Sequence, residues 1–261
     1  MMLRTALPKV CIALGFPSVE KLLAQARREL QEGESFLEFR LDYLPDPKQG
    51  IEAIRDFVKE FPEATLLVTC RRHQNHGHFN GSIEEQIHLL EQAVDAGARA
   101  IDLEIESAEN AVVKLEGLRA RTCFIVSYHN WESTPAVEAV LRRLMKVDAD
   151  AYKLVTTARK PSDIQRVLSA GKMPGRAKLI LLAMGECGFP SRILATFLRK
   201  PLHLCRSPNG RRHGIRASLC QSFARALSRR EVQPASQGFR CDCRPRAPFD
   251  LACGTQPRLS G

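Results

Sequence analysis

Short apolar runs alternate with longer amphipathic segments from the start of the chain to about residue 198. The runs are rich in β-branched residues, as buried strands are, and the segments between them repeat apolar residues at helical spacing. We expect strands at residues 9–15, 36–44, 65–71, 100–106, 123–130, 151–157 and 177–185. Seven β-α units in series predict a parallel sheet whose strands are covered by helices.

Two of the expected helices begin with recognisable capping residues. Ser18 opens the helical segment 18–31 as its N-cap, and Ser82 opens the segment 82–96 in the same way, with Glu85 three residues later. Serine and glutamate at that spacing form a capping box, in which each side chain accepts a hydrogen bond from the other residue's main-chain N–H group. The sequence therefore indicates where these two helices start.

Nearly continuous apolar strands are typical both of a (β/α)8 barrel of the TIM type and of a doubly wound sheet. A doubly wound nucleotide-binding domain carries a glycine-rich turn after its first strand, whereas this chain has Gly15-Phe16-Pro17-Ser18 there. We therefore expect an α/β fold of the TIM-barrel type. Seven of its eight β-α units are readable, and the eighth strand and helix are expected to be lost.

The second expected strand carries a charge at every second position. Leu37, Phe39 and Leu41 fall on one face and Glu38, Arg40 and Asp42 on the other. If helices cover the apolar face, the charges point into the barrel, where unpaired burial is costly. The strand is then either a half-solvated edge strand or the floor of a polar binding site.

Two further strands carry polar residues that favour a binding site. The strand at 123–130 ends in His129, and the strand at 151–157 holds Lys153 among apolar neighbours. Alone, His129 could be structural or solvated, and Lys153 could extend its amine to water. Together, near the carboxyl ends of parallel strands, they predict an amine nucleophile beside a proton shuttle. Apolar surroundings favour the neutral amine, which attacks a ketone to form an imine.

Five motifs resemble, in order and spacing, those of the type I 3-dehydroquinate dehydratases. They are Glu38-x-Arg40-x-Asp42, Thr69-Cys70-Arg71, Ser127-Tyr128-His129-Asn130, Tyr152-Lys153-Leu154 and Met184-Gly185-x-x-Gly188-x-x-Ser191-Arg192. Each motif alone is weak, but five in register are specific. The resemblance runs from about residue 9 to 197. It implies a hydro-lyase that converts 3-dehydroquinate to 3-dehydroshikimate, in the shikimate pathway of chorismate and aromatic amino acid biosynthesis, without a metal or other cofactor.

The resemblance also implies a role for each site residue. Lys153 would form a Schiff base with the substrate ketone, and His129 would be the general acid and base. The remaining implied residues are Glu38 and Arg40, which would bind substrate hydroxyls, and Arg71 and Arg192, which would line the site. Arg192 suits the substrate carboxylate, because a guanidinium binds it bidentately. One departure concerns position 75, where the best-known branch of the family has a carboxylate that helps to hold the histidine and this chain has Asn75.

Charge and composition change sharply near the end of the pattern. Residues 199–261 hold 13 basic and three acidic residues, which accounts for the whole net charge of +10, and five of the nine cysteines. We therefore divide the chain into a barrel domain at 1–198, incomplete for want of its eighth unit, and a basic tail at 199–261. The tail is either a disordered arm or a stretch read out of frame.

The out-of-frame interpretation can be tested against codon degeneracy. Codons compatible with residues 198–205, read one nucleotide later, can spell F-G-S-P-F-T-Y-A, a credible eighth strand, and those for 212–218 can spell G-T-A-S-G-Q-V, which resembles the family's missing substrate loop. Codons for 244–256 can yield a string similar to the opening motif of shikimate dehydrogenase. The hypothesis is a fused dehydratase and shikimate dehydrogenase whose frame is lost before Leu198. The alternative function is then an inactive remnant whose tail binds polyanions nonspecifically.

The remaining features narrow the class of protein. His73, His76 and His78 favour a solvated loop over a metal site, and Cys241 and Cys243 are too closely spaced for an ordinary zinc site. The tail lacks interleaved aromatic residues, so specific nucleic-acid binding is not expected. No apolar run approaches a membrane span, and the scattered cysteines of the barrel domain suit reduced thiols. We expect a cytoplasmic enzyme with a small-molecule substrate, and a homodimer is an assembly that the family often adopts.

Overall fold

One parallel sheet of eight strands forms the centre of the molecule. The computed structural model describes residues 7–172, 178–194 and 203–206. The strands are β1 (Val10–Leu14), β2 (Phe36–Arg40), β3 (Thr65–Thr69), β4 (Ala100–Glu104), β5 (Cys123–His129), β6 (Ala151–Thr157), β7 (Lys178–Met184) and β8 (His203–Arg206). Their order in the sheet is β7-β6-β5-β4-β3-β2-β1-β8. The predicted α/β fold of the TIM-barrel type is confirmed.

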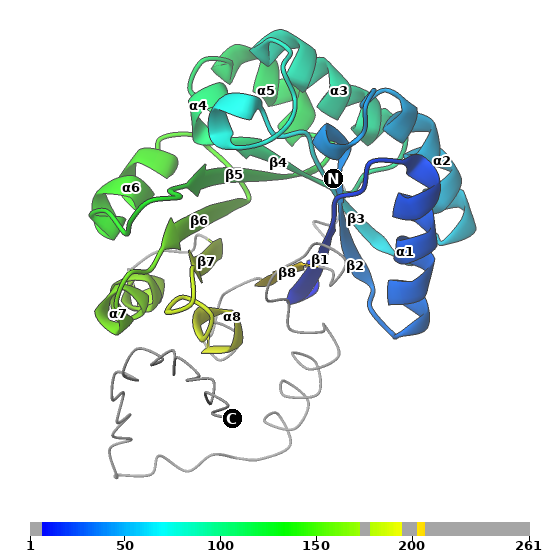
Figure 1. Ribbon diagram of the computed structural model, residues 1–261. Helices are drawn as coiled ribbons and strands as arrows, with labels where there is room; N and C mark the ends of the chain where they lie inside the picture. Colours follow the sequence, from blue (N-terminus) through cyan, green and yellow to red (C-terminus); the bar gives the residue numbers. More distant parts are fainter. Residues whose placement is uncertain (1–6, 173–177, 195–202, 207–261) are drawn as a thin grey trace, which may run out of the picture.

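Helices connect successive strands and lie outside the curled sheet (Figure 1). They are α1 (Val19–Gln31), α2 (Gln49–Glu60), α3 (Ile83–Asp95), α4 (Ile105–Ala108), α5 (Val112–Arg119), α6 (Val137–Leu144), α7 (Pro161–Ser169) and α8 (Ser191–Leu194). Three short 3-10 turns add to them, η1 (Leu41–Tyr43), η2 (His73–Asn75) and η3 (Ala170–Lys172). Within the described part of the chain, no helix combines the length and apolarity needed to cross a bilayer.

The predicted capping residues are where the sequence places them. The side chain of Ser18 accepts a hydrogen bond from the main-chain nitrogen of Lys21 at the start of α1. Ser82 and Glu85 form the full capping box of α3, with hydrogen bonds of 3.1 and 2.7 Å. These bonds satisfy N–H groups that the first turn of a helix leaves without a partner.

Alternation along the strands separates two apolar layers. Outward residues such as Leu37, Phe39 and Val126 pack with the helices in the larger core. Inward residues build a smaller core within the curl, formed by Cys11, Phe36, Leu67, Ala100, Ile125, Ala151, Val155, Ile180 and Leu182. The smaller core fills the floor of the curled sheet, so polar inward residues nearer the carboxyl ends of the strands lie above an apolar base.

The prediction that the eighth strand is lost is wrong. Residues His203–Arg206 form β8, which pairs in parallel with β1, and His203 lies opposite Val10 while Arg206 lies opposite Ala13. The edge of β1 offers main-chain hydrogen-bonding groups, and a short extended stretch can satisfy them whatever its side chains are. The rest of the predicted tail, 199–202 and 207–261, lies outside the described residues, and so do the positions after β8 where the helix of the eighth β-α unit would follow.

Candidate active site

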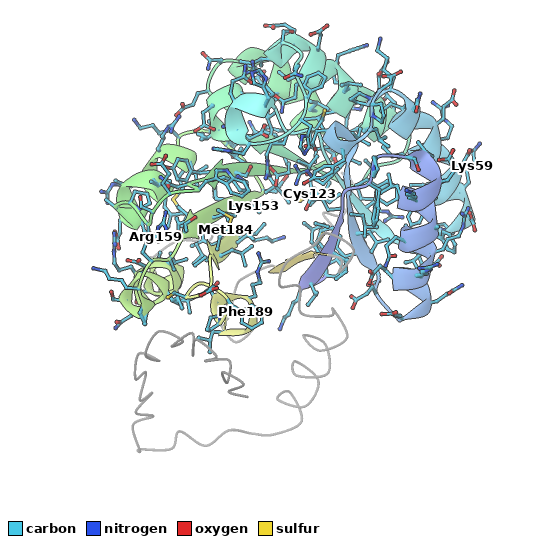
Figure 2. The ribbon with its side chains drawn as sticks, in the orientation of Figure 1. Lys59, Cys123, Lys153, Arg159, Met184 and Phe189 are labelled. Carbon is cyan, nitrogen blue, oxygen red and sulfur yellow. The ribbon has the colours of Figure 1, made fainter. Side chains whose placement is uncertain are left out.

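A pocket opens at the carboxyl ends of the strands, where barrel enzymes carry their chemistry. Its volume is about 180 Å³. All six site residues predicted from the sequence line it: Glu38, Arg40, Arg71, His129, Lys153 and Arg192. Figure 2 shows Lys153 and Met184 toward the middle of the curled sheet, whereas Lys59 lies on the outer helix α2. The fold thus brings together residues from β2, the loop after β3, β5, β6 and the start of α8.

Strand β2 supplies a carboxylate and a guanidinium to the pocket. Glu38 is 1% exposed, and its Oε1 accepts a hydrogen bond of 2.5 Å from the hydroxyl of Thr69. Its other oxygen, Oε2, is buried without a hydrogen-bond partner among the described residues. Because β2 lies between β1 and β3, the alternative of a half-solvated edge strand is wrong.

Asp42 does not line the pocket, and the expected strand 36–44 ends early, at Arg40. The chain turns there into η1, and Arg40 donates from Nε and Nη2 to the two carboxylate oxygens of Asp42, at 2.8 Å each. The guanidinium also lies over the ring of Tyr43, 4.9 Å from its centroid. Asp42 and Tyr43 therefore fix the direction of Arg40.

Lys153 is paired, although the sequence places it among apolar neighbours. Its Nζ donates to Oδ2 of Asp102 at 2.6 Å, and the hydroxyl of Ser127 donates to Oδ1 at 2.5 Å. Lys153 is 2% exposed and Asp102 is fully buried. Burial alone raises the pKa of Asp102, but the Lys153 ammonium, Arg71 and the two hydrogen bonds outweigh it and bring the pKa below its ordinary value. The amine therefore faces a carboxylate.

His129 is on the same face of β5 as Ser127, two residues further along. In the register of β5 with β6, Ser127 is opposite Lys153 and His129 is opposite Val155. Burial places the pKa of His129 well below its ordinary value of 6.5, and the cations of Arg71, Lys153 and Arg40 lower it further. The imidazole is therefore neutral near pH 7 and can accept a proton.

No side chain in the described part of the chain holds Nδ1 of His129, which is buried. Asn75 occupies the position of the family's orienting carboxylate, but its amide donates to Oε2 of Glu106 at 2.9 Å. The imidazole instead lies parallel to the indole of Trp131, with the ring centroids 6.4 Å apart and the planes at 19°. Stacking is the orienting contact that the structure provides.

Arg71 is held by a hydrogen-bonded chain that starts on helix α3. Gln86 donates to Oε2 of Glu104 at 2.7 Å, and Oε1 of Glu104 accepts a hydrogen bond of 3.3 Å from Nε of Arg71. Gln86 also donates to the carbonyl of Cys70 at 2.7 Å and accepts from Ser107 at 2.8 Å. Nη2 of Arg71 is buried without a partner among the described residues. One donor thus remains for a ligand.

Several functional residues escaped the sequence prediction. Asp102 and Glu104 alternate on β4 as the charges do on β2, so the same period of two could have found them. Other residues of the pocket wall that the sequence did not single out include Tyr43 at the end of η1 and His76 and Trp131 from loops. Within the residues that the structure describes, no three His, Cys, Asp or Glu side chains gather into a metal site.

Comparison with known proteins assigns the family. The family model described as type I 3-dehydroquinase matches residues 10–212. The chain belongs to this family. The match reaches beyond residue 197, where the resemblance was expected to end, and includes β8.

Curated relatives and solved structures agree with the family. The 3-dehydroquinate dehydratase of Desulfotalea psychrophila is 35% identical over 204 residues, covering 76% of this chain and 87% of the relative. That of Dehalococcoides mccartyi is 34% identical over 197 residues, covering 74% and 82%. The type I enzyme of Clostridium difficile superposes with a TM-score of 0.76 at 18% identity, over 84% of this chain and 92% of that one, which supports the fold.

A fused protein is also among the relatives. The bifunctional 3-dehydroquinate dehydratase/shikimate dehydrogenase of Arabidopsis thaliana is 30% identical over 194 residues. The matched region is 72% of this chain but 31% of that protein. A dehydroquinase domain of this family therefore does occur joined to a shikimate dehydrogenase, as the fusion hypothesis requires.

Proposed function

We propose that the chain acts on 3-dehydroquinate as a dehydratase, through a Schiff base on Lys153. The observation that carries the proposal is that one pocket is lined by a buried primary amine and by an imidazole whose pKa is lowered. An amine supplies covalent catalysis on a ketone, and a neutral imidazole supplies the base that the next step needs. The shared family supports the substrate.

The proposed reaction needs one nucleophile and one proton carrier. Nζ of Lys153 attacks the keto carbon, the ketone oxygen leaves as water, and an iminium ion forms. The iminium withdraws electrons, so the adjacent carbon becomes acidic enough for His129 to remove its proton. The C–O bond of the β-hydroxyl then breaks, His129 returns the proton to the departing oxygen, and a second water leaves. Addition of water to the iminium releases 3-dehydroshikimate and restores the amine.

Substrate binding is assigned to the charged groups of the pocket wall. Arg192 is the proposed partner of the substrate carboxylate, because a planar guanidinium offers two parallel donors. Oε2 of Glu38 and Nη2 of Arg71 are suited to substrate hydroxyls, since each lacks a partner among the described residues. Arg40 is held toward the same space by Asp42.

Borohydride trapping tests the proposal. Reduction of the wild-type chain with 3-dehydroquinate is expected to leave a covalent adduct on Lys153, seen as a mass increase of the corresponding peptide. Lys153→Ala should abolish the adduct, because no other amine lines the pocket within the described residues. Lys59→Ala is the matched control: Lys59 is exposed on α2, and the adduct should form as in the wild type. An adduct that persists in Lys153→Ala would refute the assignment.

The alternative of an inactive remnant loses its main support. It depended on a barrel that lacks its eighth strand, and β8 occupies that place beside β1. The out-of-frame origin of residues 199–261 remains our proposal, supported by their excess of basic residues. The nucleotide sequence around the codons for Phe197 and Leu198 decides it, because a continuous frame without the shifted strings would remove the hypothesis.

A further inference from the structure

The carboxylate of Asp102 is placed to act on the reacting nitrogen itself. It contacts Nζ of Lys153 at 2.6 Å, and its second oxygen is occupied by the hydroxyl of Ser127 at 2.5 Å. Asp102 on β4 and Lys153 on β6 both face inward, from strands that flank β5, and both are buried, where the dielectric is low and a charge pair is strong. A contact this short affects the protonation of Nζ of Lys153 as well as its position.

We propose that Asp102 is a catalytic residue that accepts a proton from Lys153 and then serves as the counter-ion of the iminium. The proposal rests on the Schiff-base function proposed above. Neither the family resemblance nor the strand pattern assigned a role to Asp102, and the contact with Nζ singles it out.

The proton balance of imine formation requires such a group. An ammonium and a ketone give an iminium and water, so two hydrogens leave nitrogen and depart with the ketone oxygen. Asp102 takes the first hydrogen, which frees the lone pair of Nζ for attack on the keto carbon. Attack leaves a second hydrogen on the positively charged nitrogen and a negative charge on the former ketone oxygen, and this hydrogen passes to that oxygen to give the carbinolamine. The carbinolamine oxygen is two bonds from Nζ, within reach of the protonated Asp102, which gives it the first hydrogen as the C–O bond breaks and water leaves. Asp102 is then a carboxylate again and faces the N–H of the iminium.

The neighbouring groups leave Asp102 as the carboxylate that can stabilise the positive charge of the iminium. Arg71, in the loop after β3, is cationic, and His129 on β5 is neutral, so neither can pair with an iminium. Of the other acidic groups, Glu104 on β4 is paired with Arg71, Glu38 on β2 with Thr69, and Cys11 on β1 is a thiol whose pKa is raised by burial. Inward residues of β7 beside the pocket are apolar. Among these groups, within the part of the chain that the structure describes, Asp102 is the one that accepts a hydrogen bond from Nζ.

The variant Asp102→Asn removes the charge and keeps the shape. An opposite charge in contact shifts a pKa by about 1–3 units, so its loss should lower the pH at which the iminium gives up its proton. We expect the basic limb of kcat against pH to move down by at least about one unit, and kcat on that limb to fall about tenfold or more. Cyanoborohydride reduces the protonated iminium, so the pH dependence of trapping on Lys153 should be shifted to lower pH in Asp102→Asn by the same amount.

Two further variants separate chemistry from structure. Glu104→Gln removes a carboxylate on the same face of β4 that pairs with Arg71 and not with Lys153, so it should leave the position of the basic limb unchanged. Ser127→Ala removes the hydrogen bond that stabilises the charge of Asp102, so the carboxylate should hold the iminium proton more tightly and move the limb upward, by less than Asp102→Asn moves it down. If Asp102→Asn fails to fold, Ser127→Ala decides the proposal alone.

The outcomes distinguish this inference from the function on which it rests. Trapping of wild-type Lys153 with an unmoved basic limb in both Asp102→Asn and Ser127→Ala would overturn the role of Asp102 and leave the Schiff base intact. Absence of any adduct on wild-type Lys153 would overturn the proposed function itself. A displaced limb in the variants, with the wild type trapped, supports both.

Discussion

The charge of a single imidazole decides whether the pocket can remove a proton. His129 is surrounded by Arg71, Lys153 and Arg40, and its Nδ1 has no hydrogen-bond partner within the described part of the chain. Burial and three cations all disfavour the imidazolium, so the neutral base persists to lower pH than for a histidine in water. Before substrate binds, His129 is therefore a neutral base and not an imidazolium acid.

The pH dependence of kcat/KM should reveal this low pKa. A histidine whose pKa is depressed is protonated only below its ordinary range, so kcat/KM should stay level as the pH falls through 6.5 and decline only below it. Steady-state kinetics over a range of pH measure this acidic limb of kcat/KM. Trp131 is the chain's single tryptophan, and its fluorescence provides an independent reading because its ring stacks on His129. An acid limb at or above 6.5 in both signals would contradict the prediction.

Strand periodicity revealed most of the site, and the loops revealed little of it. Glu38, Arg40 and Lys153 were predictable because an inward polar position is unusual in an apolar strand. Asp102 was missed because an acidic residue in an alternating strand resembles an ordinary solvated face until its partner is known. His76 and Trp131 were beyond prediction, because loop side chains meet through the three-dimensional path of the chain.

At the scale of elements, the loop after β3 determines where Arg71 points. The loop turns back so that Phe79 lies beside Arg71 and His73. The N–H of Phe79 donates to the carbonyl of Arg71 at 3.1 Å, and the N–H of His73 donates to the carbonyl of Phe79 at 2.8 Å. Gly77 lies inside this return, and a Cβ there would be 2.0 Å from the carbonyl oxygen of Arg71. The loop closes only because residue 77 has no side chain.

Gly77→Ala should therefore disturb the site through the main chain of Arg71. The added methyl group must push the loop away, which we expect to cost about 1–3 kcal/mol of unfolding free energy and to raise KM more than it lowers kcat. Gly117→Ala is the matched control, since Gly117 lies in α5 with nothing within 4 Å of an added Cβ, and it should stabilise by about 0.5–1 kcal/mol. Denaturant titration and steady-state kinetics measure both. A KM unchanged in Gly77→Ala would contradict this account.

Element boundaries were less predictable than the elements themselves. All seven expected strands exist, but β2 ends at Arg40 because the pairing of Arg40 with Asp42 turns the chain into η1. β8 was missed because four residues, His-Leu-Cys-Arg, carry no pattern of their own. Its existence depends on the edge of β1, and a long-range contact of this kind is invisible to local periodicity.

At the scale of the whole molecule, charge and architecture divide the chain at different places. Residues 1–198 are neutral, and all of the net charge follows them, yet the family match continues to residue 212 and β8 lies within that extension. Residues 199–212 carry five basic and no acidic residues, whereas 213–261 carry eight basic and three acidic ones. Two truncations therefore separate the contribution of β8 from that of the remaining tail.

Chains ending at residue 198 and at residue 212 should differ in stability. The shorter chain loses β8, so the main chain of β1 from Val10 to Ala13 becomes an unpaired edge and the curled sheet opens beside the pocket. Whole-domain stability is only about 5–15 kcal/mol, so we expect the shorter chain to melt at lower temperature and to aggregate. The longer chain should melt and turn over substrate like the full chain, while losing part of its salt-sensitive retention on heparin, because eight arginines are gone. Equal melting temperatures for the two truncations would mean that β8 contributes nothing, and the barrel would then be held by its first seven units alone.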